Sequence, residues 1–459
     1  MHRSLLLPLL FAAAGVFADV TLPAIISDHM VVQADMAAPI FGTAAPGEQV
    51  TVEINGQKKT GAADKDGKWL IKLDPQKAGG PFELKIAGKN SIAIKDVMVG
   101  EVWLASGQSN MRFPLNKTTD GAADIAKADN PRIRYVMNTG KWAVSSPAIA
   151  PNFSGVAYYF AASLQPKLNV TIGIVENSVS GAVAQRFVRK EALAADPALM
   201  EVLKIHGAAD PEIVMSDIWN DAFVPIVPYG IRGALWYQGE GNRDFPVTYR
   251  KLLATLIGDW RKQWGEGDFP FLIVQLANWQ QQKPEPWEGK DCALRESQLK
   301  TLDTVKNTAL TVTIDLGILD VHYPNKKPVG ERLAIAARGM VYGEKIEISG
   351  PIFDAAKFDG GKATVTFKHT GAGLSAKGDK LTGFLLCGAD KKFVRADAAI
   401  EGDKVIVSTA AVPAPVAVRY AWERNPPCNL YNKDGLPASP FRSDTFENYA
   451  TRDNNANDK

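Results

Sequence analysis

A serine and a histidine, each placed just after an apolar run, are the residues of this chain best suited to chemistry. Ser109 follows the apolar run 102–105, inside the segment Gly-Gln-Ser-Asn-Met. A serine in a turn between a buried strand and a helix is placed as a nucleophile would be, and the helix N-terminus favours negative charge beside it. The segment lacks the Gly-x-Ser-x-Gly pattern of many hydrolases. Alone it is also compatible with a plain turn or a helix cap.

A serine nucleophile needs a base, which is usually histidine. His322 is the candidate, because it lies in the loop 315–327 after the apolar run 310–314. Asp320, two residues earlier, is placed to orient and polarise the imidazole. The other four histidines fall in a predicted leader, in β-rich regions or in a polar inter-element segment: His2, His29, His369 and His206.

Two further apolar runs end in polar residues that suit an oxyanion hole, a set of donors for the negative charge of an acyl-transfer intermediate. One run is followed by Gln238 and Asn242, either of which is a candidate side-chain donor. Glu240, between them, is a candidate to orient the histidine or to anchor the loop. The other run is followed by Gly181, whose backbone N–H can approach a substrate closely.

The elements that must position these residues lie in a region, residues 96–344, where apolar runs alternate with helical patterns. Near-continuous apolar runs are typical of parallel strands buried on both faces, so this region predicts a doubly wound α/β domain. In such sheets ligands bind beyond the carboxyl ends of the strands, where the polar segments fall. The predicted strands are 102–105, 170–175, 231–236, 271–276 and 310–314, and the predicted helices are 156–164, 247–264 and 329–341.

Two regions with short strands and turn residues flank the α/β domain. Residues 19–95 contain Asn-Gly and Asp-Gly pairs, which supply the positive φ of tight hairpins, and predict a small β-domain. Residues 345–446 predict a second β-rich region, and the polar residues 447–459 predict a flexible tail. The strands expected in the second region are 363–367, 383–387 and 405–408.

Composition excludes several classes of protein. The 459 residues are 46% hydrophobic and 22% charged, which is typical of a globular protein of several domains. Lys and Arg number 52 and Asp and Glu 50, so the basic excess of a nucleic-acid-binding protein is missing. No run after the leader reaches the ~20 apolar residues of a membrane span. With one well-placed histidine we expect no metal and no other cofactor.

The N-terminus and the cysteines bear on the compartment. Residues 1–18 have the pattern of a cleavable signal peptide, so we expect a secreted or periplasmic protein that begins near Asp19. The three cysteines are too few to form a disulfide framework that stabilises the fold. A bridge between Cys387 and Cys428, with Cys292 free, and three buried thiols are both compatible with the sequence.

Several motifs together resemble the sialate O-acetylesterase family of the SGNH hydrolase superfamily. The similarity includes an opening segment, 22–33, and a closing segment, 429–442, so it covers nearly the whole chain after the leader. The motifs that carry it at the site are Gly107-Gln108-Ser109-Asn110-Met111, Trp236-Tyr237-Gln238-Gly239-Glu240, and Asp320-Val321-His322 with Asn325-Lys326.

The resemblance implies an SGNH-type three-layer domain that hydrolyses acetyl esters of sugars, above all O-acetylated sialic acids, without a metal. It implies that Ser109 is the nucleophile, His322 the general base and Asp320 the orienting acid. Gly181 would be a backbone oxyanion donor, and Gln238 would belong to the third conserved block of the superfamily.

The chain departs from the family pattern at three places. Leu319 occupies the position three before the histidine, where the superfamily has aspartate, so the orienting acid stays open between Asp320, Asp315 and Glu240. Gly241 replaces a serine, and residues 179–182, Val-Ser-Gly-Ala, replace Trp-Gly-Gly-Thr. The last change removes a bulky aromatic from the expected substrate rim, which leaves the sugar preference open.

Three other side chains are candidates for a sugar rim: Tyr237, Trp279 and Arg295. Aromatic rings stack on sugar faces, and arginine pairs with carboxylates such as that of sialic acid. Two alternatives remain beside the main hypothesis. One is an acetyl esterase for other glycans, such as xylan or pectin-type polysaccharides, and the other is a non-catalytic carbohydrate-binding protein.

Overall fold

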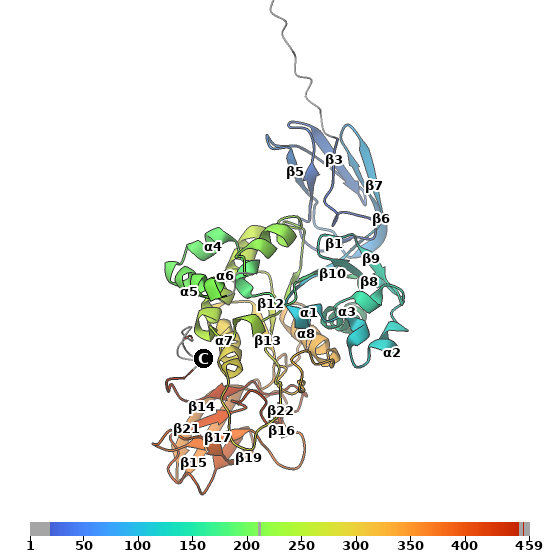
Figure 1. The fold of residues 1–459 in the computed structure, drawn as a ribbon. Coiled ribbons are helices and arrows are strands. Elements are labelled where there is room, and N and C mark those ends of the chain that lie inside the picture. The colour runs from blue at the N-terminus through green and yellow to red at the C-terminus, as the bar shows by residue number, and fades with distance from the viewer. Residues whose placement is uncertain (1–18, 210–212, 449–452, 454–459) are drawn as a thin grey trace, which may run out of the picture.

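A mostly parallel β-sheet lies at the centre of the molecule, between two β-rich regions (Figure 1). The computed structural model describes residues 19–209, 213–448 and 453. The strand order of the central sheet is β13-β12-β11-β7-β10-β8-β9, and all neighbours are parallel except β8 and β9. The strands are β7 (Ser91–Gly107), β8 (Asn130–Met137), β9 (Ala143–Ser145), β10 (Ile172–Ser178), β11 (Gly233–Tyr237), β12 (Phe271–Val274) and β13 (Thr308–Thr311).

Helices cover both faces of this sheet, which confirms the predicted doubly wound, three-layer α/β fold. Trp103 in β7 packs edge-on against Phe160 in α3 (Gly155–Leu168), with ring centroids 5.1 Å apart. Trp236 in β11 packs against Trp260 in α6 (Pro246–Trp264), with centroids 5.7 Å apart. Trp103 pairs with Gly233, three residues before Trp236, and side chains alternate between faces along a strand, so α3 and α6 lie on opposite faces.

The other helices complete the two outer layers. α8 (Lys327–Met340) packs against α3, where Gly330 lies so close that a Cβ atom would be 2.6 Å from the Phe160 nitrogen. α7 (Lys290–Thr304) packs against α6. The remaining helices are α1 (Ser109–Arg112), α2 (Gly121–Ile125), α4 (Lys190–Ala194) and α5 (Pro197–Ala209). His206 lies in α5, so the prediction that it falls between elements is wrong.

One long strand, β7, joins the N-terminal β-region to the α/β domain. Its first part pairs with β6 (Gly79–Ala87) and β1 (Val31–Gln33), and from Glu101 onward it pairs with β10. The boundary predicted at residues 95 and 96 therefore falls inside a continuous strand. The other strands of this region are β2 (Pro39–Thr43), β3 (Gln49–Ile54), β4 (Gln57–Ala62) and β5 (Lys68–Lys72).

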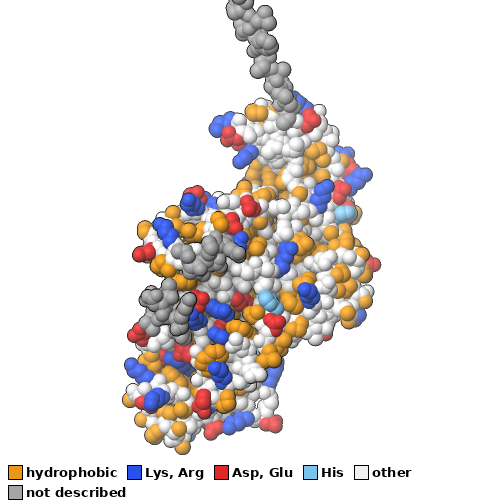
Figure 2. Space-filling view, in the orientation of Figure 1, with side chains coloured by type: hydrophobic (Ala, Val, Ile, Leu, Met, Phe, Trp, Pro, Cys, Tyr) orange, Lys and Arg blue, Asp and Glu red, His pale blue; other side chains and the backbone are white. Residues whose placement is uncertain are grey.

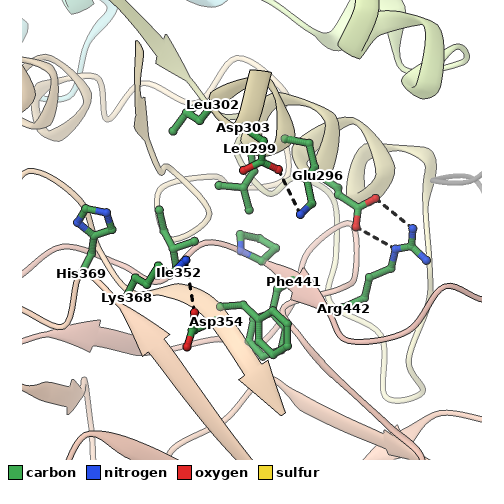
Figure 3. A pocket seen from close by; sticks show the side chains of 13 residues that line it. Glu296, Leu299, Leu302, Asp303, Ile352, Asp354, Lys368, His369, Phe441 and Arg442 are labelled. Carbon is green, nitrogen blue, oxygen red and sulfur yellow. Dashed lines mark hydrogen bonds and ion pairs between the residues drawn. The ribbon is translucent and has the colours of Figure 1, made fainter. Parts of the chain in front are cut away.

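The C-terminal β-region contains the three strands predicted for it. They belong to a set of β14 (Ile352–Asp359), β15 (Lys362–Lys368), β16 (Leu374–Ala376), β17 (Phe384–Cys387), β18 (Val394–Arg395), β19 (Asp397–Glu401), β20 (Lys404–Ser408), β21 (Ala417–Tyr420), β22 (Leu430–Asn432) and β23 (Phe441–Arg442). A cavity of about 410 Å³ separates this region from α7 (Figure 3). Its charged side chains pair with one another, as Glu296 does with Arg442, and none of the predicted site residues lines it.

The two ends of the chain and the cysteines complete the description. The predicted signal peptide, residues 1–18, lies outside the described residues. Within the predicted flexible tail, Asp453 accepts hydrogen bonds from the backbone N–H groups of Val247 and Thr248 and so caps α6. Cys292, Cys387 and Cys428 are free thiols. Over the described part of the chain, no helix combines the length and apolarity needed to cross a bilayer.

Candidate active site

The side chains of Ser109 and His322 meet at the carboxyl edge of the central sheet. The Oγ atom of Ser109 lies 2.8 Å from Nε2 of His322, within the reach required of a general base. Ser109 is the first residue of α1, directly after β7. His322 comes from the loop between β13 and α8. The two residues are 213 positions apart in the sequence.

The turn that carries Ser109 is fixed by Gly107 and Gln108. Gly107 has φ of 138°, and a Cβ atom there would lie 2.1 Å from the carbonyl oxygen of Tyr237, so only glycine fits. The backbone N–H of Gln108 donates to the same carbonyl at 3.0 Å. Its side-chain oxygen accepts from the N–H groups of Gly239 and Gly241 at 3.3 and 3.2 Å. Gln108 therefore connects the loop after β11 to the turn that carries Ser109, a role that sequence reasoning missed.

Backbone N–H groups are available near the nucleophile for an oxyanion. Ser109 is the first helical residue of α1, and the first N–H groups of a helix have no intrahelical partner. Gly181 follows β10 on an exposed turn with φ of 73°. A Cβ atom there would meet nothing within 4 Å, so the backbone conformation, not crowding, favours glycine. The oxyanion role of Gly181 stays a prediction.

Gln238 and Asn242 are buried and bonded within the protein. Nε2 of Gln238 donates to the carbonyl of Ala182 at 3.2 Å and to Oδ1 of Asn242 at 2.7 Å. Nδ2 of Asn242 donates to Gln185 at 3.0 Å. These bonds attach the loop after β11 to the loop after β10, next to Gly181. An oxyanion role for either amide stays a prediction, and their present bonds favour backbone donors.

Of the three candidate acids, Asp320 lies beside the histidine. Its Oδ1 atom is 3.7 Å from Nδ1 of His322 and accepts the backbone N–H of His322 at 2.8 Å. Asp315 is bound at 2.8 and 2.7 Å by the guanidinium of Arg332. Glu240 accepts a hydrogen bond from Asn110 at 2.6 Å. The contacts thus favour Asp320 as the acid, although 3.7 Å is longer than a hydrogen bond.

We expect Asp320→Asn to lower kcat only about 10-fold or less. The Asp320 side chain is 66% exposed, and exposed ion pairs contribute only about 0–1 kcal/mol. A buried triad aspartate, by contrast, is worth about 10⁴-fold in kcat. Steady-state hydrolysis of p-nitrophenyl acetate by the variant measures the effect, and a loss of 1000-fold or more would contradict this weak role.

The central part of the chain, which carries this site, matches a known protein family. Residues 99–338, more than half of the 459, match a family described as carbohydrate esterase, sialic acid-specific acetylesterase. The chain belongs to this family. It is therefore a carbohydrate esterase, a carboxylic ester hydrolase, and the resemblance seen in its motifs is confirmed.

Individual relatives agree with this assignment. Sialate O-acetylesterases of Homo sapiens and Mus musculus are each 26% identical to the chain; the alignments cover 91% of it and 91% and 93% of the relatives. A carbohydrate acetylesterase from Xanthomonas citri, known from a crystal structure, has 37% sequence identity to this chain. The superposition covers 93% of this chain and 100% of the chain of that enzyme, with a TM-score of 0.86.

The carbohydrate esterase carries a buried carboxyl group near the nucleophile that sequence reasoning missed. Glu176, near the end of β10, is 1% exposed and accepts a hydrogen bond from the hydroxyl of Ser178. Nη1 of Arg112, on the nucleophile helix, lies 3.3 Å from its Oε2 atom. Burial raises the pKa of Glu176 to about 7. The signal in the sequence that could have indicated Glu176 is its place directly after the apolar run 172–175.

Glu176 should make the stability of the esterase depend on pH. The pKa rises from 4.5 to about 7 on folding, so the folded state binds the proton more tightly. The contribution of the neutral carboxyl is complete below pH 4.5 and is lost as the pH rises to about 7. We expect Glu176→Gln to flatten this decline by about 1–3 kcal/mol in the free energy of unfolding. Urea unfolding of wild type and Glu176→Gln at pH 5 and 7.5 measures this difference. The prediction would be contradicted if the free energy of unfolding depended on pH in the same way in both proteins.

The predicted sugar rim is wrong at two of its three residues. Tyr237 is fully buried, and its hydroxyl bonds that of Tyr323 at 2.7 Å. Arg295 is also fully buried, so it is not available to a substrate carboxylate. Its guanidinium donates to the backbone carbonyls of Leu276, Ala277, Glu423 and Arg424. Trp279 is half-buried, with Arg243 and Arg424 over its ring at 5.4 and 4.9 Å.

Proposed function

We propose that this esterase removes acetyl groups from acetylated sugars, with O-acetylated sialic acids as the first candidate substrate. Ser109 is the nucleophile and His322 the general base. The observation that carries the proposal is the 2.8 Å contact between Ser109 Oγ and His322 Nε2 at the carboxyl edge of a parallel sheet. Membership of a carbohydrate esterase family supports the reaction class.

The reaction proceeds by two acyl transfers. Nε2 of His322 takes the hydroxyl proton of Ser109 as Oγ bonds to the acetyl carbon, and the carbonyl oxygen becomes an oxyanion. The intermediate then breaks its bond to the sugar oxygen, which receives the proton from His322. Water attacks the acetyl-serine in the same way, which releases acetate and restores Ser109. The backbone N–H groups of Ser109 and Gly181 hold the oxyanion, each worth about 3–4 kcal/mol.

We infer further that the mature enzyme is exported. The inference rests on residues 1–18, whose apolar stretch and small-residue cleavage site have the pattern of a signal peptide. N-terminal sequencing of the secreted or periplasmic protein should begin near Asp19. Retention of Met1 would contradict export by cleavage.

Three observations support a second substrate class as the alternative. Arg295, the residue expected to pair with the sialic acid carboxylate, is buried under four backbone carbonyls. The relative from Xanthomonas citri, a carbohydrate acetylesterase, is more similar to this chain than the human sialate O-acetylesterase, at 37% against 26% identity. Charges of both signs are interspersed over the face seen in Figure 2, so the visible surface does not favour an acidic glycan. Acetylated xylan or pectin-type glycans are therefore the alternative.

A substrate panel tests the proposed function. Acetate release is measured on O-acetylated sialic acid, acetylated xylan and acetylated pectin at equal ester concentration. We expect the highest kcat/KM on the sialic acid, and a higher value on xylan or pectin would favour the alternative class. Failure of a fluorophosphonate probe to label Ser109, together with no acetate release from any substrate, would leave a non-catalytic carbohydrate-binding protein.

A further inference from the structure

Beneath the nucleophile lies a buried polar network that the acyl-transfer mechanism does not use. Asn110, directly after Ser109, is 1% exposed, and Lys326, at the start of α8, is fully buried. Nδ2 of Asn110 donates to Oε1 of Glu240 at 2.6 Å. Nζ of Lys326 donates to Oδ1 of Asn110 at 2.6 Å. One amide therefore bridges a buried amine and the carboxyl group of a half-buried glutamate, whose Oε2 atom is itself buried.

Aromatic rings surround the amine of Lys326. Its Nζ atom lies 3.5 Å from the ring centroid of Tyr323, 5.1 Å from that of Phe113 and 5.7 Å from that of Tyr237. Ring faces attract a cation, which partly replaces the lost hydration. Burial nevertheless lowers the pKa of Lys326 well below its usual range, and burial raises the pKa of Glu240. Each charge therefore depends on the other, because an unpaired buried charge is costly.

The same network reaches the loop of the base. Nδ2 of Asn110 also donates to the backbone carbonyl of Val321, next to His322, at 3.1 Å. Lys326 ends the same loop, and Glu240 belongs to the loop after β11. Asn110 thus joins three strand-end loops: those of the nucleophile, of the base and of Glu240. Asp320, by contrast, is largely exposed and 3.7 Å from Nδ1 of His322.

We propose that Asn110, held between Lys326 and Glu240, positions the imidazole of His322 on Ser109. The three are positioning residues, since they act through Val321 and the nucleophile turn. The proposal rests on the proposed roles of Ser109 and His322. According to this proposal, Asn110, Lys326 and Glu240 position His322 more strongly than the exposed Asp320 does.

Asn110 depends on both of its charged neighbours. Removing the Lys326 amine leaves the Glu240 carboxylate unopposed, and removing the Glu240 charge leaves the ammonium unopposed. Either change should disturb Asn110 and, through the carbonyl of Val321, the position of the His322 ring. The two changes made together leave neither charge unopposed, so they should disturb the ring less.

The first experiment compares Lys326→Met, Glu240→Gln and the double variant in the full-length chain. The NMR signals of the His322 ring, assigned with His322→Gln, report the position of the imidazole without reference to activity. We expect these signals to move in Lys326→Met and in Glu240→Gln, and to lie near their wild-type positions in the double variant. The double variant should also be more active than Lys326→Met, since no buried charge is left unpaired.

The second experiment removes the bridge itself. Asn110→Ala should lower kcat on p-nitrophenyl acetate about 10- to 100-fold, with KM changed less than about 3-fold, because a displaced base slows the chemical step. Glu101→Gln is the matched control. Glu101 is buried and ion-paired to Arg232, but at the amino-terminal end of the same sheet strands, so this variant should leave kcat and the NMR signals of the His322 ring unchanged.

Two results would overturn the proposal. One is a His322 ring whose NMR signals do not move in either single variant, and the other is an Asn110→Ala enzyme with wild-type kcat. Circular dichroism and the melting temperature separate these effects from misfolding. If Glu240→Gln is unstable, Lys326→Met still tests the proposal, because a methionine side chain fits the apolar ring cage. Failure of the proposed function would appear differently, as an active Ser109→Ala enzyme or as no turnover by wild type, and the NMR signals decide the positioning proposal in either case.

Discussion

Ser109→Ala should lower kcat/KM for p-nitrophenyl acetate at least about 1000-fold while the fold is retained. The variant removes the atom that bonds to the acetyl carbon, and loss of a triad member in serine hydrolases has effects of this scale or larger. The side chain is partly exposed and its hydroxyl contacts His322, so alanine leaves no buried polar group without a partner in the core. Burst-phase and steady-state kinetics measure the loss.

Two observations decide this prediction. Wild type should be labelled by a fluorophosphonate probe, and Ser109→Ala should not be. Circular dichroism and the melting temperature should match those of wild type, which separates lost chemistry from lost structure. Near-wild-type turnover by Ser109→Ala would remove Ser109 from the reaction and with it the proposed mechanism.

His322→Ala should have the second large effect, a fall in kcat of at least about 1000-fold. Without the imidazole the Ser109 hydroxyl has no group at 2.8 Å to take its proton, and the sugar oxygen has no acid to protonate it. The expected loss is in kcat, because both proton transfers belong to the chemical steps. Single-turnover kinetics on p-nitrophenyl acetate should show slow acylation.

A matched histidine provides the control for this second prediction. His369 is exposed to a similar degree, 41% against 44%, and also lies beside a carboxylate, Glu347 at 2.9 Å. It belongs to the C-terminal β-region, so His369→Ala should keep wild-type kcat. His206→Ala, in α5, should do the same. A collapse of activity in either variant would mean that the base is misassigned.

The fold was predictable where hydrophobicity is strongly patterned. The predicted runs 102–105, 170–175, 231–236 and 271–276, which overlap β7, β10, β11 and β12, are mostly apolar because both faces of the sheet are covered. β8 was missed because Pro131, Arg132 and Arg134 interrupt its pattern. Arg134 is nevertheless buried, since its guanidinium pairs with Asp96 at 2.8 Å.

α7 was missed for a related reason. Its buried face includes polar side chains such as Asp291, Arg295 and Gln298, which a hydrophobic pattern assigns to solvent. Arg295 is satisfied by four carbonyls that converge only after folding. These four hydrogen bonds also explain why the prediction of Arg295 in a sugar rim was wrong. A sequence does not show which acceptors will surround a guanidinium group in the folded protein.

The sequence by itself determined which kinds of residue stand at the ends of the apolar strands, and hence the family and the proposed serine chemistry. Strand ends follow from local periodicity, which each segment carries in its own residues. Only the tertiary structure decided which strand ends meet. β13 is separated from β7 by β12 and β11, so the loop of His322 crosses the sheet edge to reach Ser109, and Asn110 contacts this loop at the carbonyl of Val321. That contact depends on packing between segments more than 200 residues apart, and no local pattern encodes it.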